Sequence, residues 1–353
     1  MMAENFTVII PVYNEEKSLP RLLPLLKTHK VIIVDDSPSN RSEAIASEYK
    51  NVTLIRRKSR SGLVSAHIEG FRHCKTDYAV TMDADLSHDP KYIKRLIKFA
   101  SATSSDLVLG SRYVSGGNTR DSSKRKLMSK TANLLFRLAF YSNIKDATSG
   151  FRVYSKKAYL FLTKQKNLEE GWAGEVDIVR RLIDNSFKCS EFPIDFIPRK
   201  EGKSKLRIRD LTHFLVFMLA IGNLLKYIIV GLSGILVNEG FLFLLHAYNI
   251  YAAEFIAVEV SLITNFIFNE TWTFKRRKLD KRLHGILSRL VKANAMFAIG
   301  FIVNYVSFFA LYFVGVYYLL ANLIAIALAF VFNYASASLF VWGEKKSADF
   351  GKT

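Results

Sequence analysis

The chain has 353 residues, of which 50% are hydrophobic and 23% are charged, and its formal net charge is +19. Its length has room for about two domains. This composition argues against one uniform soluble domain, so we expect the polar and apolar characters to be separated along the chain. A mixed, globular pattern extends to about Asp210, and long apolar stretches dominate from Leu211 to Trp342.

The first part alternates short β-branched runs with amphipathic stretches. It predicts strands at residues 6–11, 31–37, 51–55, 77–83 and 106–112, and helices at 15–27, 41–49 and 61–73. This order is typical of βαβ units and predicts an α/β domain over residues 1–210, with a doubly wound, mostly parallel sheet. Ligands of such sheets bind at the carboxyl ends of the strands, so the polar residues that follow the strands are site candidates.

Two helices between the sheet and the far apolar segments are expected to lie in a membrane interface. One is the short apolar segment 211–226, and the other is an amphipathic segment at 124–141, whose leucines and aromatics recur between basic residues. Such helices rest on anionic lipid. For 124–141, an ordinary surface helix packed on the sheet is the alternative.

The second part contains segments that are long enough to cross the roughly 30 Å hydrocarbon layer of a bilayer. Four spans are expected within a membrane domain of residues 227–345, at 227–247, 251–274, 293–316 and 317–342. Two carboxylates, Glu239 and Glu259, fall inside these spans. Such acids either join two helices or serve transport.

The membrane segments contain an internal repeat. NFIFNETWTF at 265–274 and NYASASLFVW at 333–342 lie 68 positions apart and share the first asparagine and the final aromatic residues. Upstream, GILVN at 234–238 corresponds to GFIVN at 300–304. We expect two hairpins built on one plan.

Basic residues predict the orientation. The loop 275–292 is rich in Lys and Arg, whereas residues 246–254 contain neither. Positively charged loops stay in the cytosol. We therefore expect a multi-pass protein of the cell membrane, with the N-terminal domain on the cytosolic face.

The acidic stretch TMDADLSHDP at 81–90 stands out in this basic chain. In an extended segment, Asp83 and Asp85 lie on the same side. Such a pair of hard oxygen ligands suits Mg²⁺ or Mn²⁺, which can stabilise a diphosphate leaving group. A D-x-D motif alone is a weak signal. Asp89, followed by Pro90, is expected to cap the next helix.

The order of several motifs is more specific. Four motifs resemble, in order and spacing, those of the nucleotide-sugar domain of family 2 glycosyltransferases, which has the GT-A fold. They are PVYNEE (11–16), VDDSPSN (34–40), GLVSA (62–66) and MDADLSHDP. The polyprenyl-phosphate branch of this family, above all the dolichol-phosphate mannose synthases, is resembled by GSRYV (110–114), RKLMSK (125–130), DATSGFRVY (146–154), GWAGEVD (171–177) and PRKEGKSK (198–205). The membrane repeat is similar to the GtrA-like four-helix domain, and the fused arrangement resembles that of archaeal members.

The resemblance implies a set of residues that bind the nucleotide-sugar donor. They are Pro11, Tyr13, Glu15, Val34, Asp36, Asp83, Ala84, Asp85, Ser87, Arg112, Arg199 and Lys205. Asp85 is implied as the direct metal ligand, with Asp83 and Ser87 beside it. The family usually has Gln at position 87, and because a serine hydroxyl is shorter, water or the donor diphosphate is expected to complete the metal's shell.

The resemblance also implies the residues of the acceptor and of catalysis. Arg125, Ser129, Ser149 and Arg152 are expected at the acceptor phosphate, because guanidinium groups bind phosphate bidentately. Asp85, Arg112 and Asp177 are expected to be catalytic. Asp177 matches an acidic position that is a base in relatives with hydroxyl acceptors, and here we expect it to position the acceptor or the sugar.

The implied reaction is an inverting transfer of mannose from GDP-mannose to dolichyl or polyprenyl phosphate, giving dolichyl β-D-mannosyl phosphate and GDP. The acceptor phosphate is largely ionised at neutral pH, since its second pKa is near ~6, and needs little help from a base. The sequence has no R-W dipeptide, so the Q-x-x-R-W pattern of processive synthases is missing and single transfer is favoured.

Two alternatives remain open. One is transfer from UDP-glucose, or another UDP-sugar, to a polyprenyl phosphate. The other is a translocator of lipid-linked sugars with a non-catalytic N-terminal domain, motivated by the membrane repeat and the acids within the spans. Binding to nucleic acid would explain the positive charge but neither the spans nor the acidic motif, so no nucleic-acid partner is expected.

Overall fold

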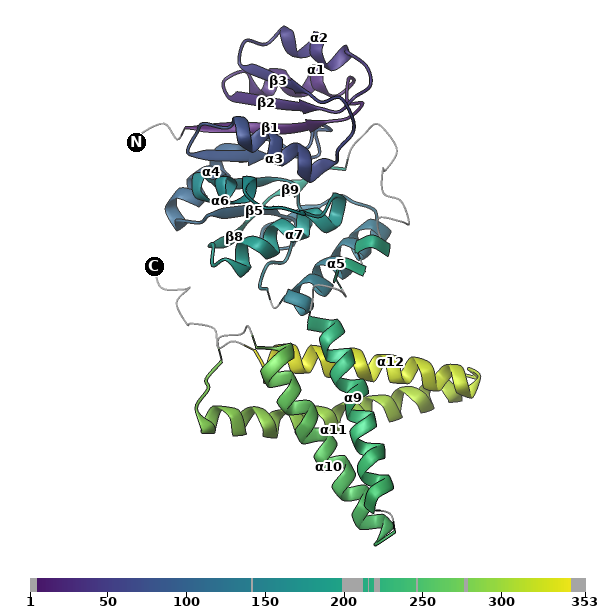
Figure 1. The fold of residues 1–353 in the computed structure, drawn as a ribbon. Coiled ribbons are helices and arrows are strands. Elements are labelled where there is room, and N and C mark those ends of the chain that lie inside the picture. Colours follow the sequence, from purple (N-terminus) through teal and green to yellow (C-terminus); the bar gives the residue numbers. More distant parts are fainter. Residues whose placement is uncertain are drawn as a thin grey trace. The chain divides into compact units, whose positions relative to one another are not determined.

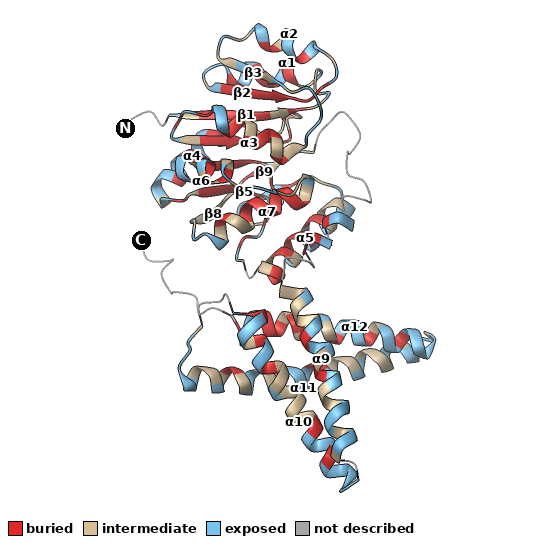
Figure 2. Cartoon of the chain, viewed as in Figure 1, coloured by how far each residue is buried: buried red, intermediate tan, exposed pale blue. Residues whose placement is uncertain are grey.

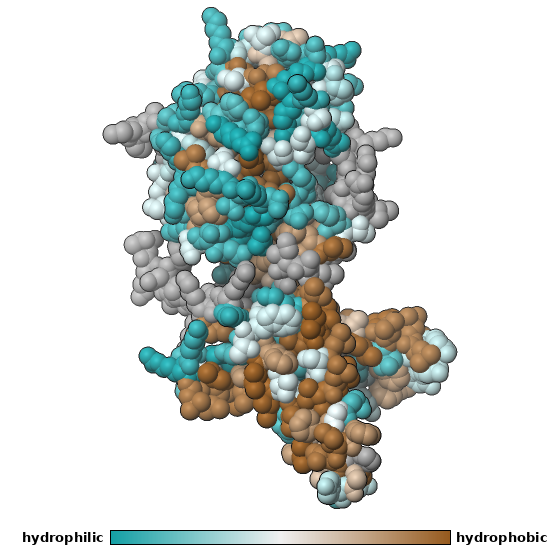
Figure 3. Space-filling view, viewed as in Figure 1, coloured by the Kyte–Doolittle hydropathy of each residue, from teal (hydrophilic) through white to brown (hydrophobic). Residues whose placement is uncertain are grey.

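The computed structural model describes residues 5–140, 142–198, 212–214, 216–218, 223–245, 247–275 and 279–343. The chain divides into two compact units, and each is described by itself. Unit 1 comprises residues 1–137 and 142–216, and unit 2 comprises residues 138–141 and 217–353. The visible face of unit 1 is largely hydrophilic and that of unit 2 largely hydrophobic (Figure 3), as the composition predicts.

Unit 1 is built around a seven-stranded sheet with the order β3-β2-β1-β4-β7-β5-β8 (Figure 1). Its strands are β1 (Phe6–Val12), β2 (Lys30–Asp35), β3 (Val52–Arg56), β4 (Tyr78–Thr81), β5 (Leu107–Ser111), β7 (Arg152–Ser155) and β8 (Cys189–Pro193). Strand β7 runs antiparallel to β4 and β5, and the other pairs are parallel. A two-stranded sheet pairs β6 (Asn118–Thr119) with β9 (Asp195–Phe196). The predicted mostly parallel sheet is confirmed.

Helices are present close to the predicted positions 41–49, 61–73 and 124–141, whereas the helix predicted at 15–27 differs. The helices of unit 1 include α1 (Leu19–Leu22), η1 (Leu23–Leu26), α2 (Arg41–Ser47), α3 (Leu63–His73), η2 (Pro90–Tyr92), α4 (Ile93–Thr103), α5 (Ser123–Phe140), α6 (Lys156–Thr163) and α7 (Gly171–Asp184). The single helix expected at 15–27 is instead two short helices. Pro20 and Pro24 explain this, because each lies in the first turn of one of them and proline lacks the N–H that a helix interior needs.

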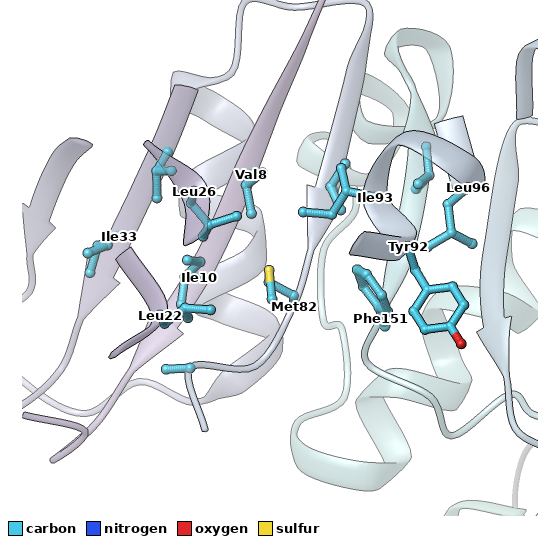
Figure 4. Packing of buried hydrophobic residues seen from close by; sticks show 14 of the residues in the cluster. Val8, Ile10, Leu22, Leu26, Ile33, Met82, Tyr92, Ile93, Leu96 and Phe151 are labelled. Atoms are coloured by element: carbon cyan, nitrogen blue, oxygen red, sulfur yellow. The ribbon is translucent and has the colours of Figure 1, made fainter. Parts of the chain in front are cut away.

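Apolar side chains are buried on both faces of the sheet, and one of these layers is a cluster that includes residues of β1, α1 and η1. Val8 and Ile10 alternate along β1 and point to the same side, where Leu22 and Leu26 cover them (Figure 4). Figure 2 shows buried residues concentrated along the strands. Burial of apolar surface stabilises the fold by roughly 25 cal/mol per Å². This layer therefore holds the strands in place, and with them the strand ends that carry the polar motifs.

Unit 2 is helical, with π-helical turns after two of its helices. Its elements are α9 (Asn223–Leu245), α10 (Ile250–Phe268), η3 (Asn269–Thr273), α11 (Leu283–Phe313), α12 (Tyr318–Ser336) and η4 (Ala337–Val341). Among the residues that the structure describes, four helical segments are long and apolar enough to cross a membrane. The third span was expected to begin at 293, but α11 begins at Leu283. Its extra turns carry Arg289, whose guanidinium pairs with the carboxylate of Glu270 and so stays buried within the unit.

The internal repeat is visible as geometry. In the first hairpin, a Cβ on Gly234 would lie 2.3 Å from Nδ2 of Asn265, and in the second a Cβ on Gly300 would lie 1.8 Å from Oδ1 of Asn333. Each asparagine therefore packs directly on the glycine of the neighbouring helix. The π-helical turns η3 and η4 also occupy equivalent places, which confirms two hairpins of one plan.

The structure describes the predicted interfacial helix at 211–226 only in part, and it describes both carboxylates within the spans. Of the helix expected at 211–226, residues 212–214 and 216–218 are helical and α9 begins at Asn223, while the rest lies outside the described residues. Glu239 is exposed on α9 and Glu259 is half-buried on α10.

Candidate active site

Unit 1 contains a cleft of about 830 Å³ at the carboxyl ends of β1, β2, β4 and β5. Helix α5 and the first turn of α7 form further walls. The cleft brings together most of the predicted site residues, namely Pro11, Tyr13, Glu15, Asp36, Asp83, Ala84, Asp85, Arg112, Arg125, Ser129 and Ser149. Segments up to about 140 residues apart in the sequence thus meet at the sheet edge where ligands of such folds bind.

The acidic turn after β4 is held by its own backbone contacts. The N–H of Ser87 donates to Oδ1 of Asp85 at 3.0 Å, and the N–H of Asp83 donates to Nδ1 of His88 at 3.1 Å. His88 is buried between the rings of Phe151 and Phe196. Burial lowers the pKa of His88, so a neutral imidazole accepts the Asp83 N–H. The turn therefore presents both carboxylates on a fixed support.

The carboxylates of this turn suit a divalent cation. The described residues contain no group of three His, Cys, Asp or Glu side chains placed to hold a metal ion. Mg²⁺ is commonly bound by only one or two carboxylates, together with substrate phosphates and water. Asp83 and Asp85 both line the cleft, and this pair of hard oxygen donors fits Mg²⁺ or Mn²⁺ bound with a diphosphate.

Arg112, which follows β5, is held by a buried acid. Its Nε and Nη2 donate to Asp146 at 2.8 and 2.7 Å, and its backbone N–H donates to the same carboxylate at 2.9 Å. Nη2 also donates to Ser129 and Thr148. Burial alone would lower the pKa of Arg112, but the bonds to Asp146 raise it. The cleft thus contains a permanently charged, oriented guanidinium.

Asp36, after β2, is bound by Arg57, the residue that follows β3. Both of its oxygens accept from the guanidinium of Arg57, Oδ2 from Nη2 at 2.6 Å, and Oδ2 also accepts from the N–H of Ser61 at 3.2 Å. Because each carboxylate oxygen has two lone pairs, Asp36 can still accept a ligand hydroxyl. Nearby, the guanidinium of Arg60 stacks 4.2 Å from the centre of the Tyr13 ring.

Glu170 joins two walls of the cleft. From just before α7, its carboxylate accepts from the N–H groups of Val64 at 3.0 Å and Ser65 at 2.8 Å, in the first turn of α3. Burial raises the pKa of Glu170, which these N–H groups oppose. A Cβ on Gly62 would lie 2.2 Å from Oε2 of Glu170, and Gly62 has a φ of +105°. The glycine of GLVSA is thus required both for its conformation and for this contact.

Four of the predicted site residues are described by the structure but do not line the cleft. Val34 and Ser87 are buried, and Ser87 acts on the acidic turn through its N–H rather than through its hydroxyl. Arg152 and Asp177 are fully buried. Arg199 and Lys205 lie outside the described residues.

The placement of Arg152 and Asp177 has a physical reason in each case. Arg152 lies on β7 and points into the unit, where its Nη2 is 2.7 Å from Oε2 of Glu175 and donates to the carbonyl of Ala147. Asp177 accepts from the guanidinium groups of Arg180 and Arg181 on the following turn of α7. Both side chains serve internal ion pairs, so we correct the expectation that they contact the acceptor or the sugar.

Several cleft residues were missed by the sequence reasoning. They are Arg60, His88, Asp121, Glu170, Trp172 and His213. His88 and Trp172 stand inside motifs already singled out, TMDADLSHDP and GWAGEVD, so the signal was present for them. Glu170 and Asp146 act on partners 105 and 34 residues away, and a single sequence does not reveal such pairs.

Comparison with known proteins decides the family. Residues 7–161 match the family described as Glycosyl transferase family 2, and residues 226–346 match the GtrA/DPMS transmembrane domain. The chain is 36% identical to a dolichol-phosphate mannosyltransferase of Pyrococcus furiosus, over 95% of this chain and 99% of that protein. The chain belongs to glycosyltransferase family 2.

Two further proteins are similar to part of this family 2 glycosyltransferase. A polyprenol monophosphomannose synthase of Mycolicibacterium smegmatis is 35% identical over 56% of this chain and 80% of that protein. A crystal structure of glucosyl-3-phosphoglycerate synthase from Mycobacterium tuberculosis is similar with a TM-score of 0.47 and 16% identity, covering 62% of this chain and 78% of the other. With its matched transmembrane domain and four apolar helices, the family member described here is a multi-pass membrane protein.

Proposed function

We propose that this enzyme transfers mannose from GDP-mannose to the phosphate of a dolichyl or other polyprenyl phosphate, releasing GDP and a β-mannosyl phosphate lipid. One observation carries the proposal. A single cleft presents the carboxylates of Asp83 and Asp85 together with the guanidinium groups of Arg112 and Arg125. The relatives named for mannosyl transfer to dolichol phosphate and polyprenol support the choice of sugar and acceptor.

The donor end of the cleft is formed by the strand ends. Pro11, Tyr13, Glu15 and Asp36 line it, and their carboxylates can accept hydrogen bonds from the base or the ribose. Asp83 and Asp85 would hold Mg²⁺ or Mn²⁺ with the diphosphate. When bound, the metal supplies charge that stabilises the departing GDP. Arg112, which Asp146 holds through Nε and Nη2, can donate to the same phosphates from Nη1.

The acceptor end is formed by α5. Arg125 and Ser129 stand four residues apart on this helix, so they share one face, and both line the cleft. A guanidinium and a hydroxyl on one face can bind the lipid phosphate. On the same helix, Leu127 and Leu134 are exposed and seven residues apart, which suits contact with lipid tails.

The chemistry follows from these two ends. An oxygen of the lipid phosphate attacks the anomeric carbon as the bond from that carbon to the GDP oxygen breaks, so the configuration inverts. The lipid phosphate needs no protein base, because it is already largely ionised at neutral pH. Asp177, which is bound by two arginines, therefore has no role in the proposed step.

The basic loop 275–292 supports an orientation with the cleft-bearing unit on the cytosolic face, by the positive-inside rule. There it would meet a cytosolic nucleotide sugar. The reaction would supply lipid-linked mannose for protein glycosylation or glycolipid synthesis.

The donor can be tested with the purified full-length chain in lipid nanodiscs. Labelled GDP-mannose and labelled UDP-glucose are each incubated with polyprenyl phosphate and Mg²⁺ or Mn²⁺, and the label in the lipid fraction is measured. Lipid-linked mannose from GDP-mannose is expected. Label from UDP-glucose alone would replace the proposed donor, and label from neither would favour a translocator.

A further inference from the structure

Unit 2 contains a cavity of its own, of about 500 Å³, among its four long helices. It follows three turns of α9 from Tyr227 to Asn238 and is also lined by residues of α10, α11 and α12. Its volume is within the range of about 300–1,000 Å³ that is usual for small-molecule sites. The proposed transfer reaction makes no use of it.

Side-chain amides line this cavity, from Asn238, Asn265, Asn269, Asn294 and Asn333. In four of them, all except Asn294, Oδ1 is buried and accepts no hydrogen bond from the part of the chain that the structure describes. Asn269 as a whole is only 6% exposed. Unsatisfied polar groups are costly among membrane helices, where bulk water does not reach them. A ligand in the cavity that brings O–H or N–H donors would satisfy these oxygens once the amide side chains turn toward it.

The other lining side chains define the partner further. None of the described residues that line the cavity carries a charge, and most are apolar or aromatic, such as Ile235, Phe297 and Phe330. A phosphate or a free ion would find no counter-charge there. An uncharged ring with several hydroxyls fits, because its hydroxyls can donate to the amides while its C–H faces contact the aromatic rings.

We propose that this cavity binds the mannosyl headgroup of the lipid-linked product. The identity of the sugar rests on the proposed function, which places this hydroxyl-rich lipid in the same membrane. Bare polyprenyl phosphate lacks such hydroxyls and is excluded. The phosphate of the product would remain outside the neutral cavity, and Lys226, next to Tyr227 on α9, supplies positive charge at that end of the helix.

The chain offers two perturbing variants and a matched control. Gly231 lines the cavity, and a Cβ placed on it meets no atom within 4 Å, so Gly231→Leu fills the cavity without a clash at that atom. Asn269→Leu removes one buried amide. Asn304→Leu is the control, because Asn304 ends the repeat motif of the second hairpin as Asn238 ends that of the first, but does not line the cavity.

The experiment uses the full chain in nanodiscs and a mannosyl phosphate of a short isoprenoid with a photoreactive group on the sugar. After irradiation, labelled peptides are quantified by mass spectrometry in α9, α10 and α12, and separately in the cleft of unit 1. Labels on the helices report the cavity, and labels in the cleft report the reaction site. Failure of the inference and failure of the proposed function are therefore distinguishable.

We expect labelling of α9 and α10 around Gly231 and Asn269, reduced about tenfold by either perturbing variant and unchanged by Asn304→Leu, while labelling of the cleft persists. For Asn269→Leu, a tenfold change corresponds to the loss of about one buried hydrogen bond, and for Gly231→Leu the reduction comes from the occupied volume. Helix labelling that is equal in all variants would overturn the proposal, and water would then be the partner of the amides. Equal competition by phosphatidylglycerol would overturn the assignment to the sugar.

Discussion

Asp146 accepts three hydrogen bonds from Arg112, two from its guanidinium and one from its backbone N–H, at 2.7–2.9 Å. Asp146 is fully buried, whereas Arg112 lines the cleft. The pair therefore joins a rigid interior anchor to a positive group at the proposed diphosphate site. Preorganised charge of this kind needs no rearrangement when the reaction develops negative charge.

Replacing Asp146, which anchors Arg112, should show how much this ion pair contributes to catalysis and to stability. Asp146→Asn keeps the shape of the side chain but leaves the buried guanidinium paired, among the residues that the structure describes, only with the more distant carboxylate of Asp121, 3.8 Å from Nη1. We expect kcat/KM for lipid mannosylation to fall about 100-fold and the free energy of unfolding by about 3–5 kcal/mol. Asp184→Asn is the control, since its partially exposed pair with Arg180 is worth at most about 1 kcal/mol. Wild-type turnover in Asp146→Asn would refute the role of the anchor.

The contact between Gly62 and Glu170 predicts a difference between two glycines. Gly62→Ala and Gly171→Ala both place a side chain at positive φ, which costs about 1–2 kcal/mol, but only the first drives a Cβ into a carboxylate. We expect Gly62→Ala to lower the thermal unfolding temperature more than Gly171→Ala, and to raise KM for the donor because the first turn of α3 shifts. Equal unfolding temperatures of the two variants would show that the Glu170 side chain moves aside without loss of stability.

In unit 2, Glu270 connects the two hairpins. Its carboxylate accepts from Nε of Arg289 at 3.0 Å and from Nε1 of Trp342 at 2.7 Å. Arg289→Met should lower the free energy of unfolding by about 3–5 kcal/mol, because it leaves the carboxylate without its cation. Adding Glu270→Leu should restore much of this loss. The exposed Lys292→Met is the control. A double variant as unstable as the single one would contradict this coupling.

The pH dependence of stability should report His67. Burial, and secondarily the charge of Arg152, lowers the pKa of His67 to about 3, whereas an unfolded histidine has its ordinary value of 6.5. The unfolded chain therefore binds the proton first, and stability is lost as pH falls from about 6.5 toward 3, by up to about 1.4 kcal/mol per pH unit.

The variant His67→Gln isolates this effect. Burial raises the pKa of neighbouring Glu175 to about 7, so between its ordinary value and 7 that residue gives the opposite slope. The difference in unfolding free energy between wild type and His67→Gln should thus shrink with falling pH. A difference that is independent of pH between 6.5 and 4 would contradict a neutral buried His67.

The sequence was sufficient to predict those elements whose residue pattern is local. The β-branched runs of β1 and β2 and the polar residues that follow them predict strands that end at one edge, and the cleft forms there. The repeat likewise predicts both hairpins of unit 2. Arg125 and Ser129 lie where motif and helix periodicity together place them.

The rest depends on contacts between distant segments. Arg152 has the residue type of a phosphate ligand, but its strand β7 inserts antiparallel between β4 and β5 and buries the side chain against Glu175. No local pattern distinguishes a strand face that meets α7 from one that meets the cleft. For the same reason the anchors Asp146, Arg57 and Glu170 emerge only from the fold.

The central claim is tested most directly at the acidic turn, with two aspartates of the same motif. Asp85 lines the cleft, whereas Asp89 caps η2 by accepting from the N–H of Lys91 at 3.0 Å. The measurement is the formation of lipid-linked mannose from GDP-mannose and polyprenyl phosphate by the full-length chain, with Mg²⁺ or Mn²⁺ and after chelation by EDTA. We predict that Asp85→Ala and EDTA each abolish the product, while Asp89→Asn retains most of it. Undiminished product from Asp85→Ala, or from the wild type in EDTA, would contradict a metal-assisted transfer in this cleft.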